Sequence, residues 1–497
     1  MIKTLFFYVD TQTSSGYTTG MGVASISSYL KKHGVFTDIV YYKSEDDFEY
    51  SIRKTKEFLP DIVGFYSPSC SWGRVKRLSE EIRLRFPAAF QVYGGIHAIL
   101  VPETLYQVDS LDALCVGYGE VPMLDLAERI ESGKEISSIR GMWVKKQRYG
   151  RIEVIKSPPY FPEGDHDEFL GFDHEAFLKE LSRFKDFEID SYRLEIIFTR
   201  GCPFSCSFCC NAKLSEIYGN KMFIPSPEAS IRVLRDSLKA TSAKFIEIHD
   251  DNLTLNKRWF REFIGMYADT VKIPFMCNMR AGTFDEDDIR LLSKTMVHSV
   301  WVGIESGNDH IRNDILKKTI SREQIVKSLD LLRKYHIDAI VQNLIGVPYE
   351  RPEDFIDTIK LNAEARPAGY QLSTLNPYPK TELYEVCARE GWLAENTDAI
   401  VQRVDPEINT PDFPKEIVRF YFLNFKRLVK YQQLRILLPY IFFLPLTHKT
   451  SRIIAAIFSI QEVIISAIRR AVKSILPEKA RIFMKKRLLR SSLSFLA

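Results

Sequence analysis

Cysteine is scarce in this chain, since only eight of its 497 residues are cysteines. Disulfide-stabilised secreted domains use cysteine far more densely, and residues 1–10 have the pattern of a first β-strand rather than of a targeting peptide. The apolar run that begins near Tyr431 is too short to span a membrane, and Pro439 and Pro445 interrupt it. These absences exclude a disulfide framework and indicate a protein of a reducing cytoplasm.

A net positive charge is lacking outside the C-terminal end. The net charge of the whole chain is +4, but from Lys449 onward eleven Lys or Arg residues face two acids, so residues 1–448 are net acidic. Residues 396–497 have a helical, basic and increasingly apolar pattern. This region fits either an interfacial helix at the inner face of a membrane or a helical cap with a solvated basic face. No nucleic-acid-reading module is recognisable, which makes nucleic acid an unlikely partner.

Residues 1–140 alternate between strand-like and helix-like patterns. Such alternation predicts an α/β domain with a doubly wound parallel sheet and helices on both faces. The expected strands are 4–9, 36–41, 62–66, 89–93 and 113–116, and the expected helices are 22–32, 45–58, 73–86 and 121–132. Glycine-bearing turns at 67–73, 94–98 and 117–120 follow three of these strands, where ligands bind in such sheets. Ordinary tight turns would have the same composition.

The next two regions complete the predicted domain organisation. Residues 141–193 look like a connector that contains a hairpin at 142–155. Residues 194–395 return to strand–helix alternation, with six strands, two fewer than a closed barrel has. We expect a partial (β/α)6 TIM-like barrel, with its chemistry on the loops after the strands. The expected strands are 194–198, 245–248, 275–279, 300–304, 339–345 and 371–375.

Three cysteines, Cys202, Cys206 and Cys209, lie on the loop after the first of these strands. Three thiolates at this spacing can hold three irons of a [4Fe–4S] cubane and leave the fourth iron open to bind a small molecule. Zinc sites pair Cys-x2-Cys with a second Cys or His pair, which is missing here. Cys210 is expected to be a packing residue. The remaining cysteines are interpreted as buried apolar residues: Cys70, Cys115, Cys277 and Cys387.

With Phe208 as its aromatic residue, the cysteine loop resembles the Cys-x3-Cys-x-aromatic-Cys signature of the radical S-adenosylmethionine (SAM) superfamily. Segments that resemble this family follow the later strands at 247–254, 278–281, 303–307, 344–350 and 376–384. The resemblance implies a [4Fe–4S] cluster that binds SAM, and a 5′-deoxyadenosyl radical formed with an electron from a flavodoxin- or ferredoxin-type donor. Tyr378 lies where it can face the substrate.

The resemblance also implies roles for residues at the strand ends. One of Asp250 and Asp251, which are adjacent, is expected to point inward toward the methionine amino group, and the other to be solvated. Arg280 can pair with the SAM carboxylate, and Glu305 can accept hydrogen bonds from ribose hydroxyls. The backbone at two further positions is expected to line the adenine: Gly346 and Pro348.

The N-terminal half resembles the cobalamin-binding domain that precedes this barrel in one large subgroup. The matching turns carry six candidate cofactor-binding residues: Gly94, Gly95, His97, Gly117, Gly119 and Glu120. The chain departs from this family pattern in one respect. Cobalamin domains that supply a histidine to cobalt carry the run Asp-x-His-x-x-Gly, and this run is missing here. His33 lies close to the expected region, but the residue two positions before it is Lys31 rather than aspartate. The resemblance implies cobalamin bound without a protein histidine, or a domain that has lost cobalamin.

The expected function is radical modification of an unactivated carbon of a lipid or secondary metabolite. Cobalamin-dependent C-methylation is the favoured reaction. Cyclisation or rearrangement, with or without cobalamin, is the alternative. An RNA-modifying methylthiotransferase is less favoured, because the N-terminal half has only Cys70 and Cys115 rather than a second three-cysteine cluster. A non-catalytic cobalamin or cluster sensor is a further alternative. No individual side chain is assigned as a catalytic acid or base.

Overall fold

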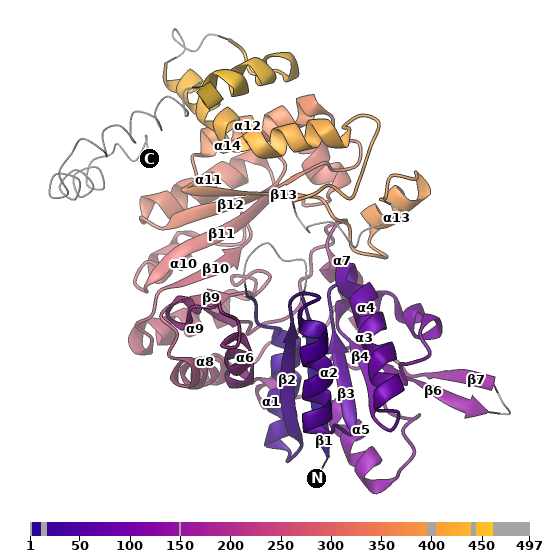
Figure 1. Ribbon diagram of the computed structural model, residues 1–497. Coiled ribbons are helices and arrows are strands. Elements are labelled where there is room, and N and C mark those ends of the chain that lie inside the picture. The colour runs from indigo at the N-terminus through magenta and orange to yellow at the C-terminus, as the bar shows by residue number, and fades with distance from the viewer. Residues whose placement is uncertain (1, 11–16, 149–150, 395–403, 439–443, 461–497) are drawn as a thin grey trace, which may run out of the picture. The chain divides into compact units, whose positions relative to one another are not determined.

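The computed structural model describes residues 2–10, 17–148, 151–394, 404–438 and 444–460. The chain forms two units, 1–422 and 423–497. The first unit contains two separate parallel-stranded sheets, each covered by helices (Figure 1). These sheets confirm the predicted fold class of an α/β N-terminal domain followed by a partial barrel.

The N-terminal sheet has the strand order β2-β1-β3-β4-β5-β6-β7. The first five strands are parallel, and β6 and β7 form an antiparallel hairpin added at the β5 edge. The order 2-1-3-4-5 is a doubly wound arrangement that binds ligands where the chain direction switches, between β1 and β3. The strands are β1 Lys3–Val9, β2 Phe36–Tyr42, β3 Ile62–Tyr66, β4 Phe90–Gly94, β5 Ala113–Cys115, β6 Met142–Arg148 and β7 Arg151–Lys156.

Helices cover both faces of this sheet. On one face α1 (Met21–Lys32) packs against α5 (Glu120–Ser132), and on the other α2 (Asp47–Phe58) packs against α3 (Trp72–Arg85). Alternate strand residues belong to different cores, with Phe6 on the α1/α5 side and Phe7 on the α2/α3 side. A short helix, α4 (Ile96–Leu100), follows β4 directly.

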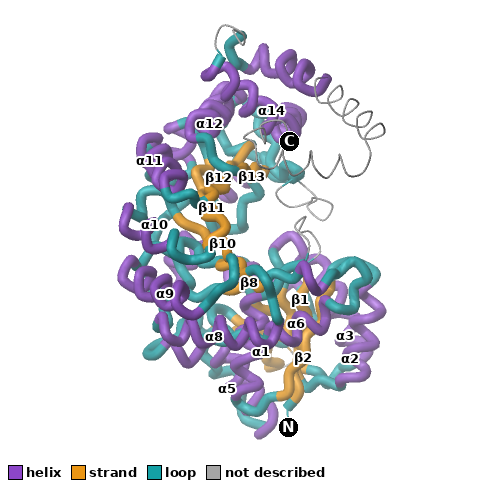
Figure 2. The backbone as a smooth tube through the Cα atoms, turned by 90° about the vertical axis from the view of Figure 1, so that its left-hand side faces the viewer, coloured by secondary structure: helices purple, strands orange, loops and turns teal. Residues whose placement is uncertain are grey.

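The second sheet is a partial barrel whose six parallel strands are paired in sequence order from β8 to β13. Its helices lie along its outer side (Figure 2). The strands are β8 Leu194–Ile196, β9 Ile246–Ile248, β10 Phe275–Met279, β11 Val297–Glu305, β12 Asp338–Ile345 and β13 Gly369–Thr374. The helices are α7 Cys210–Tyr218, α8 Pro227–Thr241, α9 Lys257–Thr270, α10 Glu286–Leu292, α11 Arg322–Lys334, α12 Pro352–Ala365 and α13 Glu382–Arg389.

Strand β8 is shorter than predicted, because it ends at Ile196 rather than at 198. The amide of Phe198 donates to the carboxylate of Asp250 instead of to a neighbouring strand, so the chain leaves the ladder there. This early exit starts the cysteine loop. The other predicted barrel strands are confirmed, with ends that move by three residues at most.

The predicted connector joins the two sheets through α6 (His174–Leu181), which contacts both β2 and α8. Asp173 caps α6 and accepts a hydrogen bond from Ser27 of α1. His174 is fully buried, with its ring nitrogens 3.1 Å from Ser237 Oγ and 2.8 Å from the carbonyl oxygen of Glu195. One apolar core therefore continues from the α1/α5 face of the N-terminal sheet into the barrel helices.

In the second unit, the end of α14 (Lys415–Leu437) and residues 448–460 are helical. None of the helices in the described ranges combines the length and apolar character that a membrane crossing requires. The predicted interfacial segment falls largely in 461–497, outside the described residues.

A π-helical turn, His310–Ile315, follows β11 and is organised by Arg312. The Arg312 side chain is completely buried and donates to the carbonyl oxygens of Ile320, at 2.8 Å, and Ser306, at 3.0 Å. It also pairs with the carboxylate of Asp309. These contacts fix the conformation of the segment 306–320. The segment includes Lys318 and Thr319, two residues of the candidate site described below.

We expect Arg312→Lys to loosen this segment, because a single ammonium group cannot reach both carbonyls and the carboxylate. Leaving buried polar groups without partners costs about 3 kcal/mol. Amide hydrogen exchange over 306–320 should accelerate on the order of 100-fold. Arg322→Lys, at an exposed ion pair with Glu364, is the matched control. Unchanged protection in the Arg312 variant would contradict this role.

Candidate active site

The cysteine loop lies between the end of β8 and the start of α7, and other segments hold it in place. Ser207 donates from its amide to the carbonyl oxygen of Leu316, at 3.1 Å, and from its hydroxyl to that of Ile315, at 2.6 Å. Ser215 of α7 donates to the carbonyl oxygen of Cys202, at 2.9 Å. The loop conformation is therefore set by contacts outside the cysteines themselves.

The three cysteines are unpaired, with Cys206 buried and Cys202 and Cys209 half-buried. Among the described residues their sulfurs do not form a set lying within 4.8 Å of one another. Zinc with thiolate ligands at its usual bond length would bring them to about 3.8 Å. At least one separation between these sulfurs is therefore too wide for a zinc ion bound to all three thiolates. Burial raises the pKa of the Cys202 thiol to about 11, so a bound metal has to stabilise the thiolate.

Asp250 braces the start of this loop. Its carboxylate accepts hydrogen bonds from the amides of Phe198, at 2.9 Å, and Thr199, at 2.7 Å, and from the Thr199 hydroxyl, at 2.6 Å. Burial raises the pKa of Asp250 to about 6, although these donors act in the opposite direction. Asp250 therefore braces the loop, and its predicted contact with a methionine amino group stays a prediction. Asp251 is exposed, and it lines the cavity next to the loop.

Arg280 lies against the middle cysteine. Its guanidinium is 3.9 Å from the Phe204 ring centroid, and its Nη1 is 3.7 Å from Cys206 Sγ. The Nη2 atom donates to Thr319 at 3.5 Å. A buried guanidinium at this point suits an anionic group bound beside the cluster, so the predicted role of Arg280 stays a prediction. Phe208 packs in an apolar cluster with residues such as Ile311.

Glu305 forms a buried ion pair with Lys318, with 2.6 Å between Oε1 and Nζ. Its backbone is left-handed, with φ of 63°, a strained conformation for a residue other than glycine or asparagine. A Cβ at Gly303 would lie 2.5 Å from Glu305 Oε1 and 2.9 Å from Lys318 Nζ, so another residue there would displace the ends of this ion pair. Sequence reasoning named Glu305 but missed Lys318, because the two lie 13 residues apart and meet through the turn after β11.

The turn after β12 is organised by a carboxylate. Glu350 Oε2 accepts from the amides of Gly346, at 2.9 Å, and Val347, at 3.2 Å. Gly346 has φ of 77°, which favours glycine, and Pro348 is buried. Full burial raises the pKa of Glu350 to about 8. The predicted contact of Gly346 and Pro348 with adenine stays a prediction, but the Gly346 amide is already used within the turn.

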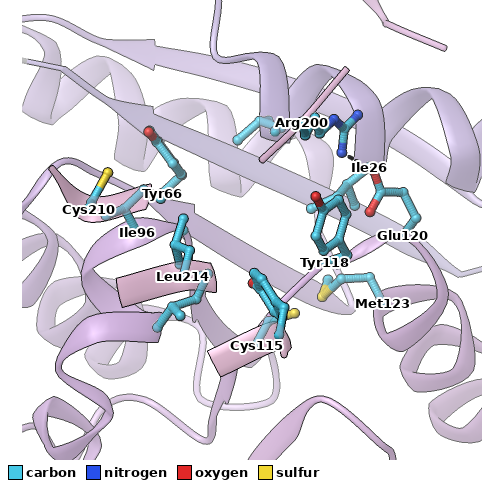
Figure 3. Close-up of a pocket in the computed structure, with 18 of the residues that line it drawn as sticks. Ile26, Tyr66, Ile96, Cys115, Tyr118, Glu120, Met123, Arg200, Cys210 and Leu214 are labelled. Atoms are coloured by element: carbon cyan, nitrogen blue, oxygen red, sulfur yellow. Dashed lines mark hydrogen bonds and ion pairs between the residues drawn. The ribbon is translucent and has the colours of Figure 1, made fainter. Parts of the chain in front are cut away.

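A cavity of about 390 Å³ lies between the N-terminal sheet and the cysteine loop (Figure 3). Residues of β1, β3, β4 and β5 form one wall, helices α1 and α5 flank it, and Cys210, Asn211 and Leu214 of α7 close the other side. Its volume is in the range of small-molecule sites and its lining is mainly apolar. Five predicted cofactor-binding residues line it: Gly94, Gly95, Gly117, Gly119 and Glu120.

His97 is an exception among the predicted residues. It is buried beside α4, where its ring stacks on Trp72 at 5.5 Å and lies 3.3 Å from the Thr104 hydroxyl. Burial lowers the pKa of His97 to about 4. It packs on the other side of the sheet and is not among the residues that line the cavity, so its predicted contact with the cofactor stays a prediction without support from this geometry. Among the described residues, no histidine lines the cavity.

A polar contact at this cavity ties the cysteine loop to the N-terminal domain. Arg200, two residues before the first cysteine, donates to Glu120 at 3.1 Å (Figure 3). It also donates to the hydroxyl of Ser25 at 3.0 Å. Ser25 also donates to Glu120 at 2.6 Å. Sequence reasoning missed Arg200 and Ser25. Their partner is 80 or more residues away, so no local pattern marks them.

A second cavity, of about 920 Å³, lies along the inner side of the barrel strands, which we call the lumen. Its lining mixes polar and apolar side chains and includes the amides Asn278, Gln342 and Gln371. Glu195, Glu247 and His249 also line it. Burial alone would lower the pKa of His249, but the two carboxylates outweigh this effect and raise that pKa to about 9.

Comparison with known families matches two parts of the chain. The model of the B12 binding domain matches residues 9–127, and that of the Radical SAM superfamily matches residues 196–361. These ranges coincide with the N-terminal sheet and with the barrel through most of α12.

Relatives of known name extend the similarity over both domains. An uncharacterised methyltransferase of Pyrococcus horikoshii is 26% identical over 406 residues, which is 80% of this chain and 85% of the relative. The cytidylyl-2-hydroxyethylphosphonate methyltransferase of Streptomyces wedmorensis is 23% identical, over 76% of this chain and 79% of its own. An anaerobic magnesium-protoporphyrin IX monomethyl ester cyclase of Rubrivivax gelatinosus is 24% identical, over 73% of this chain and 65% of the relative.

Two solved structures share the fold. The radical SAM methyltransferase TsrM from Kitasatospora setae, with tryptophan and a SAM analogue bound, superposes with a TM-score of 0.65 at 17% identity, over 79% of this chain and 77% of its own. The cobalamin-dependent SAM radical enzyme OxsB, with aqua-cobalamin and SAM bound, gives a TM-score of 0.60 at 15% identity, over 86% of this chain and 56% of OxsB.

The buried carboxyl of Glu350 predicts a measurable pH dependence. Because its pKa rises from 4.5 to about 8 on folding, the folded state binds this proton more tightly. The stabilisation is complete below pH 4.5 and is lost as the pH rises to 8, at about 1.4 kcal/mol per pKa unit. We expect Glu350→Gln to reduce the fall in thermal midpoint between pH 5 and pH 8, relative to the unaltered protein. Glu353→Gln, at an exposed position on α12, should leave that fall unchanged.

Proposed function

Because this chain belongs to the radical SAM superfamily and carries an N-terminal B12-binding domain, we propose that it is a C-methyltransferase that acts on an unactivated carbon of a secondary metabolite. The chain is a cobalamin-dependent radical SAM enzyme of the methyltransferase-like subgroup, and its cofactors are a [4Fe–4S] cluster, SAM and cobalamin. The bond that is formed and the substrate are the proposed parts.

One observation supports this proposal most directly: the cysteine loop and the helix that follows it form a wall of the cavity in the B12-binding domain. Cys210 and Asn211 line that cavity directly after Cys209, while Cys206 faces Arg280 at the end of β10. The loop thus stands between the two domains. When bound, the cofactors supply a carbon-centred radical and a transferable methyl group.

The residues of the chain hold and orient these groups. The three cysteines would ligate the cluster, and Asp250 holds the start of their loop at the end of β8. Arg280 supplies a positive charge beside Cys206, where the SAM carboxylate would lie. The contact of Arg200 with Glu120 sets the loop against the N-terminal domain. Since no histidine among the described residues lines the cavity, the fit favours cobalamin held without a protein histidine on the cobalt.

The lumen is the proposed substrate site. Its amide and carboxylate side chains suit a polar metabolite and would leave a lipid chain next to unsatisfied polar groups. A lipid is therefore the less favoured substrate class. A flavodoxin- or ferredoxin-type electron donor and a cytoplasmic location complete the proposal, because the cluster needs a strong reductant and an environment low in oxygen.

Cyclisation is the second candidate, since a cyclase is among the relatives that match most of this chain. Product mass separates the two reactions, because methylation adds one CH2 unit and ring closure adds no carbon. A methylthiotransferase would add sulfur as well as carbon, and a sensor would show no turnover of SAM.

We expect Cys206→Ala to abolish formation of 5′-deoxyadenosine from SAM in anaerobically reconstituted protein. Removal of one of three thiolates leaves the cluster without its full set of ligands. Iron content should fall in parallel. Cys210→Ala is the matched control, and it should retain the iron because Cys210 begins α7 and is not a predicted ligand. Equal deoxyadenosine from both variants would contradict the assignment.

The cavity in the N-terminal domain allows a test of cobalamin binding by a variant that should fold. Gly22 lies on α1 at the cavity wall, and an added Cβ would meet no atom within 4 Å. We expect Gly22→Phe to occupy ligand space and to weaken cobalamin binding at least about tenfold, or about 1.4 kcal/mol, in an absorption titration. Helix stability should not suffer, because glycine is a poor helix former.

The matched control for this variant is Gly265→Phe, at a glycine of α9 that also has free space around it. It should bind cobalamin like the unaltered protein. If Gly22→Phe binds cobalamin with unaltered affinity, the cavity is not the cobalamin site.

A further inference from the structure

Three ionisable side chains meet in the barrel lumen, away from the cysteine loop. Glu195 belongs to β8, Glu247 to β9, and His249 follows β9 directly. Side chains alternate across a strand, and the neighbours Ile196 and Ile248 are fully buried toward the helix layer. The three ionisable side chains consequently face the opposite side, and all three line the lumen cavity.

Their potential ligand atoms converge at ion-pair distances without forming hydrogen bonds to one another. His249 Nε2 lies 3.6 Å from Glu195 Oε1 and 3.5 Å from Glu247 Oε2, which exceeds the length of an N–H···O hydrogen bond. The Nε2 atom is screened from solvent and makes no hydrogen bond. Within the described part of the chain, these are the only three His, Cys, Asp or Glu side chains whose ligand atoms lie within 4.8 Å of one another.

The second oxygen of each carboxylate accepts a hydrogen bond that fixes the orientation of the group. The second oxygen of Glu195 accepts a hydrogen bond from the amide of Thr19, in the N-terminal domain. The second oxygen of Glu247 accepts one from Arg193 Nη1, at 2.9 Å. With one oxygen fixed in this way, the other oxygen of each group is directed at His249. Outer contacts of this kind orient the ligands of metal sites.

We propose that Glu195, Glu247 and His249 bind a divalent cation of the zinc type in the barrel lumen. A tetrahedral ion at zinc's usual bond lengths to nitrogen and oxygen separates its ligands by about 3.4 Å, close to the 3.5 and 3.6 Å observed. Two carboxylates neutralise the ion's charge. The imidazole selects against magnesium and calcium, which prefer oxygen ligands alone.

The fourth position of such an ion opens into a cavity of about 920 Å³. Three protein ligands with one open position are typical of zinc sites that bind a further molecule. The ion would take a lone-pair donor of the substrate, such as a hydroxyl or carboxylate oxygen, and hold it beside the amides of Gln342 and Gln371. This positioning role rests on the proposed function, but cation binding does not.

Zinc binding is tested on full-length protein with its cluster reconstituted. After incubation with zinc and removal of the excess, we expect one zinc per chain by elemental analysis. Zinc K-edge absorption should show nitrogen and oxygen ligands at about 2.0–2.1 Å and no sulfur at about 2.3 Å. This measurement needs no variant and no turnover. Sulfur ligation would assign the zinc to vacant cysteines, and either that result or no retained zinc would overturn the proposal.

Variants then locate the ion. Glu247→Gln and His249→Gln should each lower retained zinc at least tenfold while the iron content stays constant. The matched control is His310→Gln, at an exposed pair in which His310 Nδ1 lies 2.8 Å from Asp314 Oδ2 with no third ligand. Retention of zinc in all three variants would overturn the site. Zinc binding without methylated product would instead contradict the proposed function and leave the cation site intact.

Discussion

The site depends on how the chain leaves β8. The carboxylate of Asp250 accepts hydrogen bonds from the amides of Phe198 and Thr199. In a longer strand these amides would have donated to a neighbouring strand of the sheet. This exchange ends the strand at Ile196 and turns the cysteine loop over the barrel. Farther along the loop, the hydrogen bonds of Ser207 to the turn after β11 hold the loop at a second point. A cluster that needs three thiolates at set positions therefore has its ligands arranged by protein contacts.

The same loop is coupled to the N-terminal domain. Arg200 joins Glu120 and Ser25, and Glu195 at the base of β8 accepts from Thr19. With α6 packed between the sheets, the two domains share one apolar core. Groups that act in sequence can then be held at fixed separation, which is how positioning lowers a barrier without any acid or base from the protein.

Local patterns in the sequence were sufficient for the sheets, the cysteine loop and the glycine turns, because each depends on residues close together in the chain. The functions of single side chains were harder to predict. Asp250 braces the loop, and His97 points into the core, because burial and partners from other strands decide where each points. Lys318, Arg200 and Glu195 were missed for the same reason: their partners are brought together only by the folded barrel and its contact with the N-terminal domain.

The central claim is that Cys202, Cys206 and Cys209 hold a [4Fe–4S] cluster whose open iron binds SAM. Electron paramagnetic resonance of the reduced, anaerobically reconstituted protein tests it directly. The account predicts the signal of a reduced [4Fe–4S] cluster, and a change in that signal when SAM is added. A reduced cluster whose signal is the same with and without SAM, or a metal at these cysteines that is not an iron–sulfur cluster, would contradict it.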